Sequence, residues 1–432
     1  MCSVLKAFLM ILWGLDEKSI IAKQALIFET NFDLPESAQS DLLILPRVFI
    51  RTLGKIVKAK KSLKSKLNYA EVAALGESER VWGSHRQFNQ ENQLPLTKLH
   101  LSYGQVLESL TLIEFFGSVI LFFLLVPVIM LPALLSKRRA SYANCLLYAC
   151  QLFVIQRRLK LAQTKLFIDY SAYSNQSNWL ALVLMKRGVE VIKIPSIVPF
   201  AGHFKNVIAS KLWLSTPYHL DETNVFASTH FVGEYLKGKP KNAIYLDKYE
   251  TAGLKAMPKV LGYYSHASWL RADQDHGASE FCLPEMEETV LRYLVSYCEA
   301  RNDLKLHVFT HPRERSAEMV ARTKAYYHTL LAKDIVSEIY FGEERSSLSF
   351  EAAEVGVGTM SSILFERLLC GFKTLFYTDG MISFPVPNSD ISSICAPDKD
   401  KLFEMLDEQF ASASHAILDR YRYDAEFYTQ KQ

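Results

Sequence analysis

The sequence has few cysteines, and their spacing excludes the sites that cysteines usually build. The seven cysteines are irregularly separated, with no Cys-x-x-Cys pair and no cysteine–histidine cluster at zinc spacing. We therefore expect neither a disulfide scaffold nor a zinc domain, and reduced cysteines in a cytoplasmic environment fit best. Residues 1–15 are apolar with one lysine and lack the small-residue cleavage site of a secretory signal.

A large excess of charge of either sign is also missing. The chain has 49 Lys and Arg against 46 Asp and Glu, a net charge of +3. So small an excess excludes a protein that holds nucleic acid by bulk charge. Of the 432 residues, 49% are apolar, which excludes a disordered chain. This length allows two or three domains of ~100–200 residues each.

One long apolar run departs from the pattern of a soluble protein. Residues 115–135 carry no charge, and ~20 such residues suffice to cross the hydrocarbon core of a bilayer. Lys137, Arg138 and Arg139 follow directly, and basic residues favour the cytoplasmic side. Pro127 and Pro132 are expected to interrupt a helix here.

A second basic stretch lies upstream, because residues 51–66 contain only basic charges. Both stretches would attract anionic headgroups. We therefore predict a re-entrant or monotopic anchor at the cytoplasmic face of a membrane, with both flanks in the cytoplasm. A single span and a buried core helix are the alternatives. Residues 1–15 are expected to form either a second interfacial contact or a core helix.

Strands and helices alternate after the apolar run, which is typical of an α/β fold with a doubly wound parallel sheet. The predicted organisation is an N-terminal part of a first lobe at 1–110, an anchor at 111–164, a Rossmann-like lobe at 165–250 and a second at 251–432. The predicted strands are 25–28, 42–45, 165–170, 189–194, 211–215, 259–264, 305–310, 335–341, 353–357 and 373–377. The predicted helices are 178–187, 284–300, 317–331, 361–369, 398–412 and 416–423.

A glycine- and hydroxyl-rich segment follows the predicted strand at 353–357. It reads GVGTMSS and includes Gly358, Thr359, Ser361 and Ser362, with Glu366 one turn into the next helix. Glycines let a ligand approach the backbone, and the free N–H groups at a helix N-terminus favour an anion. A carboxylate one turn on would accept hydrogen bonds from ribose. The alternative is that a serine caps the helix and Glu366 is a solvated surface charge.

Two histidines also follow strands of the second lobe. His311 and Arg313 come after the strand at 305–310, and Tyr264 and His266 come at the end of the strand at 259–264. Ligands of open α/β sheets gather outside the carboxyl ends of the strands. The histidines would then donate to a phosphate or protonate a leaving group. The alternatives are a His-Pro turn for His311 and a packing role for His266.

Residues 165–423 resemble bacterial glycosyltransferases of the GT-B fold, which have two Rossmann-like lobes, and one stretch of the second lobe resembles their donor-binding end. The stretch GVGTMSSILFERLLCGFKTLFY carries this likeness. A His-Pro pair, a later glutamate and a Ser-Ser pair more narrowly resemble the CMP-sialic acid and Kdo transferases of capsule or lipooligosaccharide synthesis. The resemblance implies that His311 contacts the cytidylate phosphate and assists its departure, and that Glu338 holds the ribose or base. It also implies that Ser361 and Ser362 bind the phosphate.

The acceptor-side base is less specific in this sequence. Asp169, at the end of a predicted strand, and Asp273 or Asp275 in a polar loop are the candidates. The Asp-x-Asp pattern at 273–275 is a metal motif of a different glycosyltransferase fold, and in this polar loop we expect no essential metal. The candidate acceptor-binding residues are Tyr173, Asn175 and His203.

The sequence thus predicts a membrane-associated glycosyltransferase that uses a nucleotide-sugar as co-substrate and needs no further cofactor. The preferred donor is a CMP-linked acidic sugar, and the acceptor is lipid-linked or a surface glycan. A UDP- or GDP-sugar donor is one alternative, with Glu366 holding the ribose. A CDP-polyol phosphotransferase and a non-catalytic membrane scaffold are the others. Nothing in the sequence fixes the oligomeric state.

Overall fold

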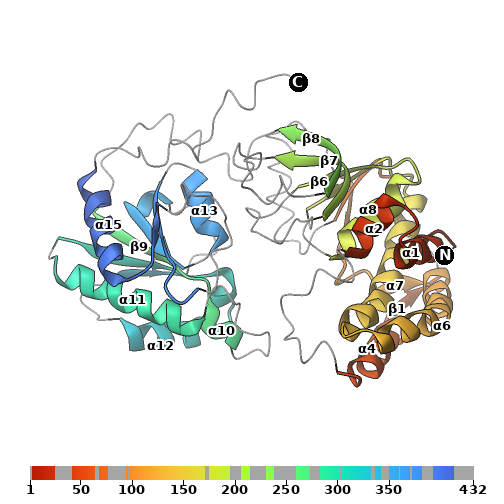
Figure 1. The fold of residues 1–432 in the computed structure, drawn as a ribbon, viewed down its shortest axis with the longest axis horizontal. Coiled ribbons are helices and arrows are strands. Elements are labelled where there is room, and N and C mark those ends of the chain that lie inside the picture. Colours follow the sequence, from red (N-terminus) through yellow and green to blue (C-terminus); the bar gives the residue numbers. More distant parts are fainter. Residues whose placement is uncertain are drawn as a thin grey trace. The chain divides into compact units, whose positions relative to one another are not determined.

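The computed structural model divides into two compact units, which are described separately (Figure 1). Unit 1 comprises Met1–Ser215 and Val225–Lys241, and unit 2 comprises Thr216–Asn224 and Asn242–Gln432. The structure describes residues 2–24, 41–63, 68–75, 94–95, 97–170, 175–194, 206–214, 230–237, 259–272, 283–301, 303–331, 336–341, 350–359, 361–369, 372–381 and 393–412.

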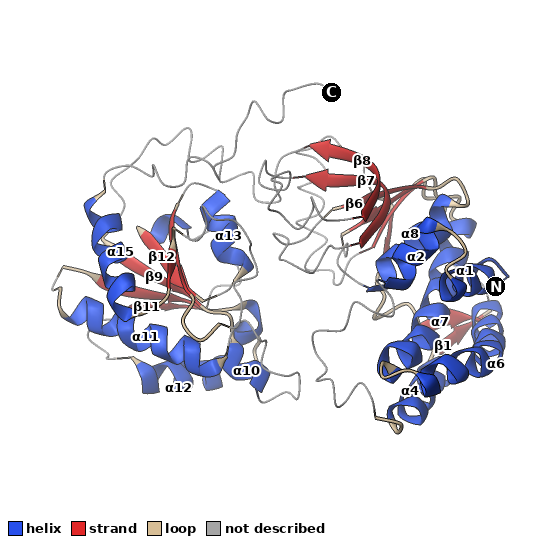
Figure 2. Cartoon of the chain, in the orientation of Figure 1, coloured by secondary structure: helices blue, strands red, loops and turns tan. Residues whose placement is uncertain are grey.

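Unit 1 contains a six-stranded sheet whose neighbouring strands all pair in parallel, in the order β3-β2-β5-β6-β7-β8. The strands predicted at 165–170, 189–194 and 211–215 are confirmed as β5, β6 and β7, whereas β2, β3 and β8 were not predicted. Helices α2 and α8 pack against β7 (Figure 2). The bounds are β2 Val72–Leu75, β3 Leu99–Leu101, β5 Leu166–Asp169, β6 Glu190–Lys193, β7 Asn206–Leu214, β8 His230–Lys237, α2 Glu17–Lys23 and α8 Asn175–Met185.

The N-terminal segment of unit 1 is helical where a strand was expected. Helix α4 (Ile44–Lys58) begins within the predicted strand at 42–45, and residues 42–43 form a turn, so that prediction is wrong. The run Leu-Leu-Ile-Leu fits either structure when taken alone, and burial of Leu45, Thr52 and Ile56 along one helix face decides it. The strand predicted at 25–28 lies outside the described residues. Helix α1 (Cys2–Trp13) is a core helix, and its Phe8 ring packs 5.3 Å from that of Trp179.

The long apolar segment forms helix α6 (Leu112–Leu135), followed by helix α7 (Arg139–Leu161), and the pair lies between β3 and β5 in the chain. Among the described residues, α6 is the one helix long and apolar enough to cross a bilayer, a test that core helices also pass. The helix continues through Pro127 and Pro132, contrary to expectation. Pro127 lies on the exposed face, so the carbonyl that loses its partner is on the side away from the core.

Unit 2 contains a second six-stranded parallel sheet, in the order β11-β10-β9-β12-β13-β14. Five strands confirm the predictions at 259–264, 305–310, 335–341, 353–357 and 373–377. The chain runs from β9 outward to β11 and then returns to the other side of β9, so the strand order reverses between β9 and β12. The bounds are β9 Val260–Tyr264, β10 Lys305–Phe309, β11 Val336–Tyr340, β12 Val355–Gly358, β13 Lys373–Tyr377 and β14 Cys395–Ala396.

Helices flank this sheet and bury its apolar strands (Figure 2). The helices predicted at 284–300, 317–331, 361–369 and 398–412 are confirmed, and the one at 416–423 lies outside the described residues. Pro284 begins α11 because proline is preorganised for the first helical turn, where its missing donor costs nothing. The bounds are α10 Ser268–Ala272, α11 Pro284–Glu299, α12 Val320–Leu330, α13 Ser362–Leu369 and α15 Lys399–Ala411.

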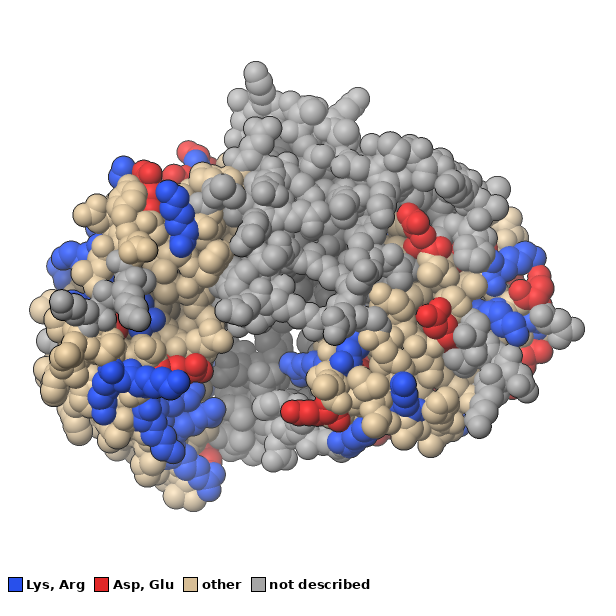
Figure 3. Space-filling model, turned by 180° about the vertical axis from the view of Figure 1, so that it is seen from behind, with Lys and Arg blue, Asp and Glu red and all other residues tan. Residues whose placement is uncertain are grey.

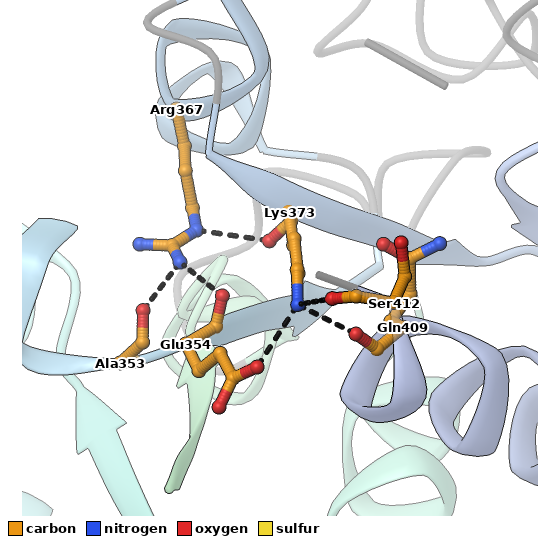
Figure 4. A network of polar contacts seen from close by, with 6 residues as sticks. All are labelled: Ala353, Glu354, Arg367, Lys373, Gln409 and Ser412. Atoms are coloured by element: carbon orange, nitrogen blue, oxygen red, sulfur yellow. Dashed lines mark hydrogen bonds and ion pairs between the residues drawn. The ribbon is translucent and has the colours of Figure 1, made fainter. Parts of the chain in front are cut away.

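Two buried cations connect the elements on one side of the unit 2 sheet (Figure 4). The Arg367 guanidinium donates to the carbonyls of Phe350, Ala353 and Lys373 at 2.6, 2.6 and 3.2 Å. The Lys373 ammonium donates to Glu354 Oε1 at 2.9 Å and to two carbonyls at the end of α15. A buried charge is tolerated only when its donors are satisfied, so this network fixes α13 and α15 against β12 and β13.

Candidate functional site

The carboxyl edge of the unit 2 sheet brings together the three segments that the sequence singled out. Strand β9 lies between β10 and β12, with Tyr264 opposite Phe309 and Tyr263 opposite Val357. The chain therefore leaves all three strands at the same edge, and each strand end carries a predicted residue. His266 follows β9, His311 follows β10 and Ser361 follows β12. By strand spacing, the ends of β10 and β12 lie about 10 Å apart.

The segment after β9 is organised by a buried carboxylate. Glu287, in the first turn of α11 and 1% exposed, accepts from Tyr263 Oη at 2.6 Å. It also accepts from the backbone N–H groups of His266 and Ser268, both at 2.6 Å, and from the Ser268 hydroxyl. Several donors converge on one carboxylate, which offsets the cost of burying its charge. Glu287 thus fixes the path of the loop that carries His266.

The segment after β10 contains a second buried carboxylate. His311 caps the single turn Pro312–Arg315, and its Nδ1 accepts from the backbone N–H of Arg313 at 3.1 Å. Because Nδ1 is used as an acceptor, the neutral ring carries its proton on Nε2. Glu314 accepts from His311 N at 2.5 Å, from Trp269 Nε1 at 2.7 Å and from Tyr327 Oη at 2.9 Å. It therefore joins the β9 and β10 loops to α12.

Glu314 has a strongly perturbed acidity. Burial raises the pKa of its carboxyl from 4.5 to about 7, and the negative charge of Glu287 acts in the same direction. The hydrogen bonds from Trp269, His311 and Tyr327 favour the ionised form and offset part of the rise. The carboxyl therefore changes charge near neutral pH at the base of the His311 loop.

The segment after β12 places hydroxyls at the start of α13. Thr359 is fully buried and Ser361 is 5% exposed, and the Ser361 carbonyl accepts from Leu364 N at 3.1 Å. The preceding glycines make room for protein atoms. A Cβ on Gly356 would lie 2.5 Å from Arg367 Nε, and one on Gly358 would lie 2.7 Å from the Tyr264 carbonyl oxygen. Close packing within unit 2 is thus sufficient to require both glycines.

The other predicted donor-side residues occupy different places. Arg313 is exposed, whereas Tyr264 is buried and accepts from Arg367 Nη1 at 3.0 Å. Glu338 is exposed within β11, opposite His307 of β10. Strand β11 lies three strands from β12, roughly 14 Å by strand spacing, so the sheet does not bring Glu338 close to Ser361. The side chains of Ser362 and Glu366 lie outside what the structure describes.

Unit 1, the predicted acceptor lobe, has a buried polar cluster at the carboxyl edge of its own sheet. Asp169, at the end of β5 and 1% exposed, accepts from Ser177 Oγ at 2.6 Å. Lys193 lies opposite it on β6 and donates to Asn178 Oδ1 at 2.5 Å. Tyr173, His203, Asp273 and Asp275 lie outside the described residues, and Asn175 begins α8 with its side chain likewise undescribed.

Sequence reasoning missed the buried charged residues that hold these loops. Glu314 had a local signal, because a glutamate three residues after a capping position closes a capping box. Glu287 lies next to Met286 on the apolar side of its helix, which is the only sequence hint of its burial. Lys193 ends strand β6, which reads Glu-Val-Ile-Lys, and Arg367 lies in a predicted apolar helix. Among the described residues, no three Cys, His, Asp or Glu side chains group as a metal site.

Comparison with known proteins gives low similarity throughout. No protein-family model matches the sequence, and no curated protein matches it significantly. A UDP-GlcNAc 2-epimerase from Methanocaldococcus jannaschii aligns at 13% identity over 86% of this chain and 90% of its own, with a TM-score of 0.42. MurG from Acinetobacter baumannii aligns at 12% identity over 64% and 72%, with a TM-score of 0.36. At these scores, the alignments carry no conclusion about this chain.

Proposed function

We propose that unit 2 binds the nucleotide of an activated sugar at the carboxyl ends of β9, β10 and β12. The observation that carries the proposal is the reversal of strand order between β9 and β12. Ligands of doubly wound sheets bind outside the carboxyl ends of the strands at such a switch point. His266, His311 and Ser361 all follow strands at this place, and two buried carboxylates hold the first two loops in position.

The chemistry of these groups suits a departing phosphate. His311 Nε2–H would donate to a phosphate oxygen from the β10 side, and Ser361 and the N-terminus of α13 would donate from the β12 side. The exposed guanidinium of Arg313 would add positive charge. In glycosyl transfer, the acceptor oxygen bonds to the anomeric carbon and its hydroxyl proton passes to a base. The bond between that carbon and the phosphate oxygen breaks, and the nucleotide leaves with its phosphate. Asp169 of unit 1 is our candidate base.

We therefore propose a glycosyltransferase of the GT-B type, with unit 2 as the donor lobe and unit 1 as the acceptor lobe. The preferred donor remains a CMP-linked acidic sugar, on the resemblance of the His-Pro and Ser-Ser pairs. A lipid-linked or glycan acceptor at the cytoplasmic face of the inner membrane fits the apolar helix α6. A CDP-polyol transferase would use the same phosphate-binding groups. The two activities are distinguished by the donor from which CMP is released, a CMP-sugar for the glycosyltransferase and a CDP-polyol for the polyol transferase.

Thermal unfolding of the full chain with CMP, CDP, UDP or GDP tests the proposal. A ligand at a hundredfold excess over its dissociation constant stabilises the folded state by ~2.7 kcal/mol. We expect CMP to raise the unfolding temperature. Stabilisation by UDP alone would overturn the cytidylate assignment, and no effect of any nucleotide would overturn the enzyme assignment and favour the scaffold.

Substitutions locate the bound nucleotide. Loss of one hydrogen bond to a charged phosphate weakens binding by about tenfold or more, so His311→Ala and Ser361→Ala should each raise the dissociation constant for CMP by that factor. His328→Ala is the matched control, because His328 is an exposed histidine of the same unit. Calorimetric titration measures all three variants. Equal affinity in His311→Ala and His328→Ala would place the nucleotide elsewhere.

A further inference from the structure

Helix α6 has two apolar faces, of which one is buried and the other is exposed to solvent. One face is buried in unit 1 and includes Leu121, Leu125 and Ile129. The other is exposed, with Phe116 at 58%, Phe123 at 61% and Leu135 at 82%. A continuous apolar surface of this kind is rare on a soluble monomer and marks a site of interaction. The exposed apolar residues of α6 are Ile113, Phe116, Ile120, Phe123, Leu124, Leu131, Leu134 and Leu135.

The buried face of α6 is fixed to the protein by specific contacts. At its N-terminus, Glu114 is 1% exposed, pairs with Arg158 of α7 at 3.2 Å and completes a capping box with Thr111. A Cβ on Gly117 would lie 2.4 Å from the ring of Phe153, so α6 and α7 are in close contact there. Helix α7 is itself largely buried in the core of unit 1. Lipid can therefore reach α6 from one side only, which does not suit a lone membrane span.

Helix α4 packs beside α6 and adds positive charge to the same end of unit 1. The rings of Phe49 and Phe122 lie 6.4 Å apart and join the two helices. Ile50 is 73% exposed, and Leu43 and Val57 lie seven residues on either side of it and are also exposed. The exposed basic residues of this region are Arg47, Arg51, Lys55, Lys58, Lys60 and Lys61. Figure 3 shows Lys and Arg side chains gathered over the part of unit 1 where α4 lies.

We propose that the exposed residues of α4 and α6, the α4–α6 surface, dock unit 1 onto an anionic lipid bilayer with α6 in the plane of the interface. Exposed apolar side chains flanked by basic ones are the pattern of helices that insert one face at the headgroup boundary. The basic residues of α4 favour an anionic lipid surface over a second copy of this chain as the partner. Two copies joined at this surface would bring their basic α4 helices together, and these would repel each other. The inference deepens the membrane association proposed above and is independent of the nucleotide site.

Vesicle co-sedimentation of the full chain, without nucleotide, tests the surface. We expect at least tenfold stronger partitioning onto phosphatidylcholine vesicles containing roughly a third phosphatidylglycerol than onto phosphatidylcholine alone, and weaker partitioning as NaCl rises. The double variants Arg47→Glu/Arg51→Glu and Phe116→Ser/Phe123→Ser should each lower partitioning at least tenfold. Arg292→Glu and Leu283→Ser, at exposed positions of unit 2, are the matched controls. No binding of the wild-type chain to either vesicle overturns the proposal.

A second measurement separates docking from spanning and does not depend on disruptive variants. Phe116→Trp and Phe123→Trp place reporters near one end and at the middle of the exposed face of α6, positions that a span would hold at different depths. Phospholipids brominated at shallow or deep positions quench their fluorescence. An in-plane helix predicts the same shallow depth for both reporters. Clearly different depths would show a span and overturn the proposal. A concentration-dependent dimer that Phe116→Ser/Phe123→Ser abolishes, without vesicle binding, would assign the surface to a second copy.

Discussion

Glu314 is expected to make the stability of unit 2 depend on pH in a way that one substitution removes. Its pKa is 4.5 in ordinary surroundings and about 7 in the fold, because the carboxyl is buried and close to Glu287. Between these values the folded state binds more protons than the unfolded state, so the free energy of unfolding falls as pH rises. Applied to both pKa values, this linkage gives a loss of about 2.5 kcal/mol between pH 5 and pH 8.

The assay compares the wild type with Glu314→Gln. Denaturant unfolding at pH 5 and pH 8 gives the difference in unfolding free energy between the two proteins at each pH. We expect that difference to change by about 2.5 kcal/mol between the two pH values. Glutamine is also destabilising at both pH values, since one amide oxygen cannot accept from the three donors around Glu314. Glu318→Gln, at an exposed position nearby, should show no pH-dependent difference. A stability difference that is the same at both pH values refutes the reasoning.

A direct titration checks the same group in the folded state. Trp269 is the only tryptophan in residues 242–432, and its indole N–H donates to Glu314. In protein labelled with 5-fluorotryptophan, the fluorine resonance of Trp269, identified by Trp269→Phe, should titrate with a midpoint near pH 7. Glu314→Gln should abolish that titration. A Trp269 resonance that is flat from pH 5 to pH 8 would show that the carboxyl does not change charge there.

Two further predictions concern the packing of unit 2. Gly356→Ala should destabilise the protein by about 2 kcal/mol, since the new methyl group overlaps Arg367; no loss of stability would mean that Arg367 moves freely. Lys373→Met should cost about 3 kcal/mol because it leaves the buried Glu354 carboxylate and two carbonyls without their donor. Lys399→Met, at an exposed position, is its control, and thermal unfolding measures both.

Five of the six strands of unit 2 could be predicted, because each contains apolar residues in a short stretch bounded by polar, glycine or proline residues. The two-residue strand β14 was not predicted. The elements of unit 1 were harder to predict, for two reasons. Strand β2 reads Val-Ala-Ala-Leu, and alanine has a low strand propensity, so this strand carries no clear local signal although it lies inside the sheet between β3 and β5. The run at 42–45 lacked a clear period, and the helix prevailed because α4 buries one face against α6 and α7.

The candidate site was predictable in position and much less in its supporting residues. Parallel strands bring their carboxyl ends to one edge, so the segments that carry His266, His311 and Ser361 were expected at the same sheet edge because each follows a strand of one unit. The roles of Glu287 and Glu314 arise from tertiary burial, because each accepts hydrogen bonds from residues distant in sequence. The glycines before Ser361 fit ligand approach and close packing equally well in the sequence, and only the position of Arg367 reveals the packing role.

The insertion of α6 and α7 between β3 and β5 sets an order of events during synthesis. Val72 of β2 pairs with Leu166 of β5, 94 positions later (166 − 72). Pairing over so long a separation is slow, because the chain loses the entropy of closing the loop before any stabilising contact between the strands forms. On the ribosome, α6 therefore emerges before β5 is made and can pair with β2. Its apolar face is then available to a chaperone or a bilayer while the rest of unit 1 is still being synthesised.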